Sequence, residues 1–338
     1  VPPPGFVWNN SDFDRQRPIM EFMHRTASGL IAALGLVLLL SQQAAIADSS
    51  LALPNRDNLN LGSVHAAIMD LEKGELLHGK YANVAVPIAS LTKVMTALVI
   101  LESDQALNET IPIVERHRPA PVNAYSRIRI GSEARRGDLV RIALMASENL
   151  AAYVLARHYP GGFDAFIKAM NNRAASLGMD DTRFVDPAGL SSENQSTAAD
   201  LTRLLSAAWK NDRLRELSTT RYFTIHFRNP RYQLSYGNTN LLVHRKSWDL
   251  ELTKTGYLDA AGRCLMMATQ VDGRTLGMVF LDAFGKHTPL GDAGRVKRWL
   301  KTGNSGSIAR AARRHEQERI QKFRDSDEVN AKLSDHSP

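Results

Sequence analysis

Alternating hydrophobic and polar positions predict strands near both ends of the chain. In the N-terminal part, residues 64–70 and 75–79 flank a Glu-Lys-Gly turn, a pattern typical of two strands joined by a tight connection. In the C-terminal third, residues 250–256 alternate as a strand. Two apolar runs, 264–270 and 276–282, then flank an Asp-Gly pair, which is a strong hairpin signal. Hairpins at both ends indicate an antiparallel sheet.

Helical periodicity dominates the middle of the chain. The expected helices are 90–101, 139–146 with Asp138 as its cap, 150–156, 162–178 ending at Gly178, 198–209 capped by Ser196 or Thr197, and 292–300. Residues 104–137 are expected to be irregular, with short strands such as 126–130, and 180–195 are expected to form a loop. Strands at both ends and helices between them indicate an α+β fold, with a helical insertion between the two halves of the sheet.

The beginning of the chain has the pattern of an export signal. Residues 23–26 form a short basic segment, 27–40 are strongly apolar, and 44–47 (Ala-Ala-Ile-Ala) resemble a cleavage site. A translation start at Met20 or Met23 would make the first residues an upstream extension. The apolar block is shorter than the ~20 residues that a spanning helix needs. We therefore expect a cleaved signal peptide, with a membrane anchor as the alternative.

Cleavage after Ala47 divides the chain into three parts. Residues 1–47 are the upstream extension and signal peptide, and 48–303 form the folded domain. Residues 304–338 are expected to be a charged C-terminal tail or solvated helix, because large apolar residues are few there. A cleaved signal implies export across a bacterial inner membrane, so we expect the mature protein in the periplasm.

Composition narrows the possible partners. The net charge of +7 and pI near 9.5 favour contact with nucleic acid, a membrane surface or an anionic cell-wall polymer. Nucleic acid is disfavoured, because no basic cluster with interleaved aromatics is present. The single cysteine, Cys264, excludes an intrachain disulfide and a CxxC site, and its apolar neighbours indicate a buried strand residue. The histidines lack ligand spacing, so no metal or other cofactor is expected.

The first indication of chemistry is a polar pair at the start of the helix 90–101. Ser90 and Lys93 are three residues apart and therefore share one helix face. Pro87 precedes the helix, as suits a helix start. The positions after Lys93 are almost wholly apolar, which predicts a buried helix. A hydroxyl and an ammonium are costly to bury there, so the pair suggests function rather than packing.

Three short motifs occur in order along the chain. They are Ser90-x-x-Lys93, Ser147-x-Asn149 and Lys254-Thr255-Gly256. Their expected settings are a helix start, a helix–helix junction and an inner strand. Taken singly, Ser90 is explained as a helix N-cap, Lys93 as a solvated helix residue and Lys254 as an edge-strand charge. Ser147 and Asn149 are explained in the same way as loop or cap residues. These structural explanations would require three independent motifs to occur in this order by chance.

Over roughly residues 50–300, the sequence resembles the serine DD-peptidases of the low-molecular-mass penicillin-binding proteins. It is most similar to the D-alanyl-D-alanine endopeptidase branch (penicillin-binding protein 7 type, peptidase family S11). Besides the motifs, the matching stretches are 186–191, 194–198, 254–257 and 261–264. Tyr257 follows the third motif where the carboxypeptidase branch commonly has His. No second β-rich domain follows residue 300, although many carboxypeptidase relatives carry one.

The resemblance implies a DD-peptidase/β-lactamase-like fold, an antiparallel five-stranded sheet with a helical subdomain between its halves. It makes 48–303 a serine DD-peptidase catalytic domain. Ser90 is then the acyl-ester nucleophile, Lys93 the general base and Ser147 a proton relay. The substrate-binding residues are Asn149, Lys254, Thr255, Gly256 and Tyr257. The backbone N–H groups of Ser90 and Tyr257 would form the oxyanion hole.

To act as a general base, Lys93 must have a pKa well below that of an ordinary lysine. An ordinary lysine pKa of about 10.4 lies ~3.4 units above pH 7, which corresponds to ~4.6 kcal/mol. We expect burial, the positive end of its own helix and the nearby Lys254 to lower this pKa. No histidine stands in a recognisable triad motif that would replace Lys93 as the base.

The predicted function is a periplasmic DD-endopeptidase that hydrolyses D-alanyl cross-links of peptidoglycan stem peptides. β-Lactams would be covalent inhibitors, and other cell-wall enzymes are possible partners. Three alternatives stay open: a DD-carboxypeptidase, a β-lactamase, and a non-catalytic peptidoglycan-binding scaffold. The middle motif contains Glu148 where lactamases have Asp, and no Glu-x-x-Leu-Asn follows it, which disfavours the lactamase. The intact triple motif disfavours the scaffold.

Overall fold

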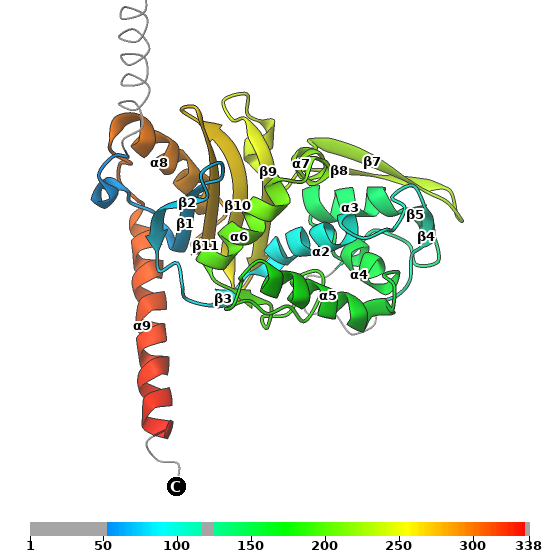
Figure 1. Cartoon of the computed structure of the whole chain (residues 1–338), viewed down its shortest axis with the longest axis horizontal. Coiled ribbons are helices and arrows are strands. Elements are labelled where there is room, and N and C mark those ends of the chain that lie inside the picture. The colour runs from blue at the N-terminus through cyan, green and yellow to red at the C-terminus, as the bar shows by residue number, and fades with distance from the viewer. Residues whose placement is uncertain (1–52, 117–124, 335–338) are drawn as a thin grey trace, which may run out of the picture. The chain divides into compact units, whose positions relative to one another are not determined.

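Five antiparallel strands from both ends of the chain form the central sheet (Figure 1). The computed structural model describes residues 53–116 and 125–334. In spatial order the strands are β2 (Glu75–Lys80), β1 (Ser63–Asp70), β11 (Arg274–Ala283), β10 (Gly262–Val271) and β9 (Leu250–Leu258). The pairing of β1 with β11 joins the two halves of the sheet, from Ser63 opposite Ala283 to Asp70 opposite Leu276. The α+β prediction and both sheet hairpins are confirmed. The expected signal segment, 1–47, lies outside the described residues.

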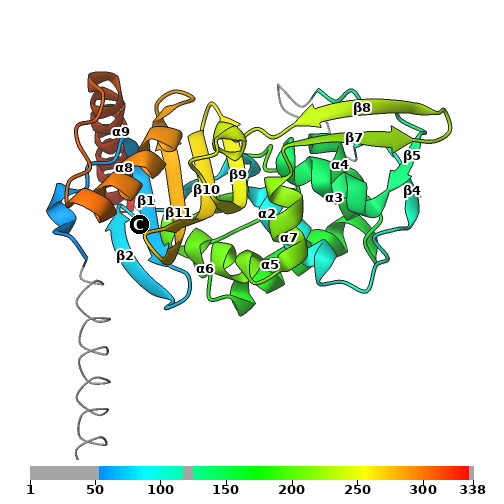
Figure 2. The ribbon, with the colours of Figure 1, turned by 90° about the horizontal axis from the view of Figure 1, so that it is seen from above.

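The helices between the sheet halves form a second part of the domain. They are α2 (Thr92–Leu101), α3 (Arg136–Met145), α4 (Asn149–Arg157), α5 (Gly162–Ser176), α6 (Ala198–Trp209) and α7 (Asp212–Thr219). After the sheet follow α8 (Thr288–Thr302) and α9 (Arg310–Ser334). In Figure 2, α6 lies on one face of the sheet while α8 lies on the other. Seven of the ten residues of β10 and nine of the ten residues of β11 are buried, as expected when both faces are covered.

Helix α2 is the centre of the helical part. Nine of its ten residues are buried, and it contacts α3, α4, α5, α6 and α7. A helix that is apolar on all sides has no solvent face, so its neighbours can surround it. The 3₁₀ turn η2 (Ala89–Leu91) precedes α2 and lies against β9. The start of α2 is therefore at the boundary between the helices and the sheet.

Three local predictions are wrong. Residues 126–130 form no strand, because Gly131 turns the chain at a φ of +82° and Ile130 is exposed. The pair in this region is instead β4 (Thr110–Pro112) with β5 (Glu133–Arg135). Asp138 is not a cap, since α3 begins two residues earlier with Arg135 as its N-cap.

The third error concerns the strand order. Strand β9 was expected to be an inner strand, but it is the last strand of the sheet beyond β10. Its outer edge faces η2 and the helical part. A further hairpin, β7 (Tyr222–Phe227) with β8 (Tyr232–Gly237), was not anticipated. The remaining short elements are η1 (Arg56–Asn58), β3 (Val86–Pro87) paired with β6 (Gln195–Ser196), and η3 (Leu241–His244).

Residues 310–334, part of the segment expected to be a charged tail or solvated helix, form helix α9. Its first turns contact the sheet: Ala312 is buried, and Glu316 lies 2.9 Å from the ammonium of Lys80 on β2. Arg319 and His315 both contact the buried carboxylate of Asp282 on β11. Within the part of the chain that the structure describes, no helix is long and apolar enough to cross a membrane.

Candidate active site

Ser90 and Lys93 meet at the junction of η2 and α2. The Nζ atom of Lys93 lies 2.9 Å from the Oγ atom of Ser90. Ala89, immediately before Ser90, has a φ of +47°, a conformation that costs a residue with a side chain of order 1–3 kcal/mol. The predicted pair therefore forms, on a backbone that the surrounding structure holds in a strained conformation.

The other contacts of Lys93 fit a neutral amine. Its Nζ atom lies 2.8 Å from Oδ1 of Asn149 and 2.5 Å from the carbonyl oxygen of Ala188. Both oxygens can only accept hydrogen bonds. A neutral amine has two N–H groups for these acceptors, and its lone pair is then left to accept the hydroxyl proton of Ser90. The arrangement thus suits removal of a proton from Ser90.

Burial is the main reason that Lys93 can be neutral near physiological pH. Its side chain is completely buried, and this desolvation lowers its pKa to about 7, with Arg116 acting in the same direction. The carboxylates of Asp186 and Glu148 oppose the shift. The expected effect of burial is confirmed. Burial also places the pKa of Lys254 well below its ordinary value, and the charge of Lys93 lowers it further.

The loop after α5 supplies the carbonyl that holds Lys93. The carboxylate of Asp186 accepts hydrogen bonds from the backbone N–H groups of Ala188, Gly189, Leu190 and Ser191, at 2.6–3.3 Å. These bonds fold residues 186–191 into a tight turn around one side chain. The turn directs the Ala188 carbonyl toward Lys93. The family resemblance rested in part on the stretch 186–191, but it implied no role for Asp186.

Ser147 and Asn149 occupy the junction between α3 and α4. Ser147 has a φ of +59°, the second strained position at this site. Glu148, between the two fixed residues of this motif, is buried, and its carboxylate caps α4 by accepting from the N–H of Ala151 at 2.6 Å. Burial raises the pKa of Glu148. A polar residue directly before a helical run was the available signal for this cap.

The third motif forms the edge of β9 that faces Ser90. The Thr255 hydroxyl donates to Thr239 at 2.7 Å, and the buried Lys254 donates to the Thr255 carbonyl at 2.8 Å. Gly256 permits the close approach of β9 to η2. A Cβ atom at residue 256 would lie 3.2 Å from the Ser90 nitrogen and 3.2 Å from the Ile88 carbonyl oxygen.

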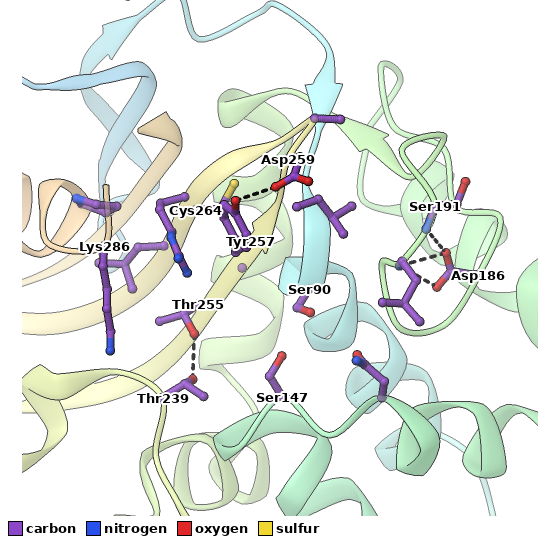
Figure 3. Close-up of a pocket in the computed structure, with 18 of the residues that line it drawn as sticks. Ser90, Ser147, Asp186, Ser191, Thr239, Thr255, Tyr257, Asp259, Cys264 and Lys286 are labelled. Atoms are coloured by element: carbon purple, nitrogen blue, oxygen red, sulfur yellow. Dashed lines mark hydrogen bonds between the residues drawn. The ribbon is translucent and has the colours of Figure 1, made fainter. Parts of the chain in front are cut away.

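These elements surround a cleft of about 1170 Å³. Ser90 and Ser147 face each other across it, with Thr255 and Thr239 on one side and Asp186 on the other (Figure 3). Asn149, Gly256 and Tyr257 also line it, whereas Lys93 and Lys254 lie buried behind the lining residues. The structure thus brings all eight predicted site residues together. Sequence reasoning missed Thr239, because the β7–β8 hairpin and η3 that surround it were not anticipated.

Cys264 lines the cleft from β10, and burial raises the pKa of its thiol to about 12, so it is not a thiolate nucleophile. Among the described residues, no group of three or more His, Cys, Asp or Glu side chains could hold a metal ion.

Comparisons with known proteins agree with the motifs. The model of peptidase family S11, described as D-alanyl-D-alanine carboxypeptidase, matches residues 53–285. The D-alanyl-D-alanine endopeptidase of Pseudomonas aeruginosa is 44% identical over 293 residues, which are 86% of this chain and 94% of that protein. The D-alanyl-D-alanine endopeptidase of Escherichia coli is 46% identical over 252 residues, covering 75% and 81%.

Solved structures show the same fold. The Streptomyces K15 DD-transpeptidase has a TM-score of 0.64 at 26% identity, covering 73% of this chain and 97% of that one. Penicillin-binding protein D2 of Listeria monocytogenes, solved in its cefotaxime-bound form, has a TM-score of 0.61 at 28% identity, covering 73% and 98%.

Proposed function

Because this chain belongs to the D-alanyl-D-alanine carboxypeptidase family of serine peptidases, we propose that it is a periplasmic DD-endopeptidase. It would hydrolyse D-alanyl cross-links between peptidoglycan stem peptides through an acyl-enzyme on Ser90. The observation that carries the mechanism is the 2.9 Å contact between Ser90 and the buried Lys93, whose pKa is about 7. The endopeptidase activity is supported by the names of the two relatives from P. aeruginosa and E. coli.

In the proposed acylation step, Lys93 acts as the general base. Its neutral amine accepts the Ser90 proton while Oγ attacks the carbonyl carbon of the scissile D-alanyl bond. With a pKa of about 7, roughly half of the Lys93 side chains are neutral at pH 7. Asn149 and the Ala188 carbonyl keep Nζ in place during the transfer, since both accept hydrogen bonds from it.

The oxyanion that forms would be stabilised where η2 meets β9. We assign the donors as the backbone N–H groups of Ser90 and Tyr257. The close packing at Gly256 supports this assignment, because it brings the β9 backbone next to the Ser90 nitrogen. Loss of one donor in such a hole typically costs ~3–4 kcal/mol of transition-state stabilisation.

Ser147 is the proposed relay for the leaving group. It faces Ser90 across the cleft (Figure 3), and we place the departing amine on that side. The amine leaves with a proton passed through the Ser147 hydroxyl, and water then hydrolyses the Ser90 ester. Thr255 and Asn149 would contact the substrate from the cleft wall. Lys254 does not line the cleft and would act on the substrate through Thr255, whose carbonyl accepts its hydrogen bond.

A digestion of purified muropeptides tests the function. Cross-linked dimers are expected to become monomers, and a Ser90→Ala variant should leave them intact. Conversion of pentapeptides to tetrapeptides without cleavage of dimers would contradict the endopeptidase assignment and support a carboxypeptidase. Rapid turnover of a chromogenic cephalosporin would instead support a β-lactamase.

A further inference from the structure

A second hollow of about 480 Å³ lies beside the catalytic cleft, between η3, α8 and residues 305–307. Three arginines line it: Arg245, which follows η3, and Arg295 and Arg298 on α8. We call it the arginine pocket. No aspartate or glutamate is among the residues that line it. The hollow therefore has a strongly positive wall and no negative charge of its own at the surface.

Two of the three guanidinium groups are available to a ligand. Arg295 is held in place, since it contacts Asp292 at 3.1 Å and donates to the Ser307 carbonyl at 3.2 Å. Arg245 and Arg298 are exposed, and neither forms an ion pair with a described residue. An arginine fork binds a carboxylate or phosphate through two parallel hydrogen bonds, so one fixed and two free guanidinium groups suit an anionic group.

The space in the pocket depends on glycines of α8. Gly291 and Gly294 line the hollow, and a Cβ atom at 294 would meet no atom within 4 Å. A glycine inside a helix costs about 1 kcal/mol relative to alanine. No neighbouring atom lies close enough to residue 294 to require a glycine there. Packing therefore does not explain why a residue that weakens the helix occupies this position. Because Gly294 lines the hollow, a side chain at this position would extend into open space at the wall of the pocket.

The arginine pocket adjoins the cleft directly. Leu290 lines both hollows. Lys286 lines the cleft while the next residue, His287, lines the pocket. A polymer that occupies the cleft beyond Ser90 can therefore continue along the start of α8 into the pocket.

We propose that the arginine pocket is a second binding site for the peptidoglycan substrate, and that it binds carboxylate groups of the stem peptides away from the scissile bond. This inference rests on the proposed function, since a cross-linked substrate carries carboxylates on both strands. A membrane surface is the other anionic candidate for a protein of net charge +7. Continuity with the catalytic cleft favours the polymer.

The test measures binding to purified sacculi in a Ser90→Ala background, which removes hydrolysis. The double variant Arg245→Gln/Arg298→Gln should bind about tenfold more weakly, equivalent to about 1.4 kcal/mol. Gly294→Leu should weaken binding similarly by filling the pocket, although it changes no charge and favours the helix. Amidation of the sacculus carboxylates should remove the difference between wild type and variants.

The matched control removes two exposed cations that line neither hollow, through Lys210→Gln/Arg231→Gln. It should bind sacculi within twofold of the parent. Equal weakening by this control, or unchanged binding of the pocket variants, would overturn the proposal. So would pocket-dependent sedimentation with phosphatidylglycerol vesicles together with unaltered sacculus binding.

Readouts at Ser90 keep the two proposals separate. With Ser90 restored, the pocket variants should cleave soluble muropeptide dimers with a raised KM and a kcat like that of the wild type, because the pocket binds the substrate away from the reacting atoms. If the wild type cleaves no dimers, the proposed function fails, while the binding experiment still decides whether the pocket holds carboxylates.

Discussion

The contacts of one side chain, Lys93, determine what the site can do. Completely buried, it touches Ser90, the proposed nucleophile, and two hydrogen-bond acceptors, Asn149 and the Ala188 carbonyl. Charges of both signs act on it, with Arg116 lowering its pKa and the carboxylates of Asp186 and Glu148 raising it. The balance leaves a base that is neutral in a useful fraction of molecules near pH 7.

The pH dependence of acylation follows from this pKa. Only the neutral amine accepts the Ser90 proton, and the neutral fraction grows as pH rises. The second-order rate constant for reaction with a fluorescent penicillin should therefore increase about tenfold per pH unit below the Lys93 pKa of about 7, then level off above it. A rise centred near pH 10, or a fall between pH 6 and 8, would contradict Lys93 as the base.

Replacing Glu148 should move this profile. Its carboxylate raises the pKa of Lys93, so Glu148→Gln should shift the midpoint of the profile to lower pH. The amide oxygen of glutamine can still cap α4 through the Ala151 N–H, which keeps the helix intact. Glu148→Ala serves as the comparison, since it also loses the cap at a cost of about 1 kcal/mol in unfolding free energy. An unchanged midpoint in Glu148→Gln would contradict the effect of the Glu148 carboxylate on the pKa of Lys93.

At the level of single residues, the sequence predicted the contact between Ser90 and Lys93 but not the groups that support Lys93. Ser90 and Lys93 are three residues apart, so helix geometry alone predicts their contact. Asp186 folds its turn through neighbours within five residues, but its effect reaches Lys93, 93 positions away in sequence. That effect depends on where the loop lies in the fold, which no local pattern reports.

At the level of elements, the contact between β9 and η2 positions the reacting groups. Gly256→Ala should displace β9 by a few tenths of an ångström, because its Cβ atom would lie 3.2 Å from Ser90 N, Ile88 O and the Ala89 side chain. We expect the acylation rate to fall at least tenfold, as a shifted oxyanion donor predicts, while the unfolding free energy changes by about 1 kcal/mol. An unchanged acylation rate would remove this contact from the mechanism.

The elements that sequence predicted well are those with a strong periodic pattern. The β1–β2 and β10–β11 hairpins and the helices α4 and α6 were expected from their hydrophobic spacing and turn residues. The segment 126–130 alternates as a strand does, yet no neighbouring strand pairs with it in the structure. The edge position of β9 follows from the pairing of β1 with β11, a long-range contact that leaves no local signal.

At the level of the whole molecule, α9 packs on the sheet against β1 and β11. The buried Asp282 carboxylate contacts both Arg319 and His315 of this helix, and Lys80 contacts Glu316. None of these residues lines the cleft. Some of the charged residues of the segment 304–338 therefore form ion pairs that hold α9 on the folded domain.

Truncation of the chain tests whether α9 contributes to stability without contributing to acylation. A chain that ends at Ala309 leaves Asp282 without Arg319 and His315, so its unfolding free energy should fall by about 3 kcal/mol. Its rate of acylation by a fluorescent penicillin should stay within twofold of the full chain at a temperature where both are folded. A chain that ends at Asp325 keeps these ion pairs and should unfold like the full chain. Loss of acylation in the folded shorter chain would show that α9 also supports the site.

The central claim is that Ser90 is the nucleophile that forms the acyl-enzyme. Mass spectrometry of the protein after brief incubation with benzylpenicillin tests it most directly. The wild type should gain the mass of one penicillin, and peptide mapping should place the adduct on Ser90, while Ser90→Ala should gain none. No adduct on the wild type, or an adduct that persists in Ser90→Ala, would contradict the assignment.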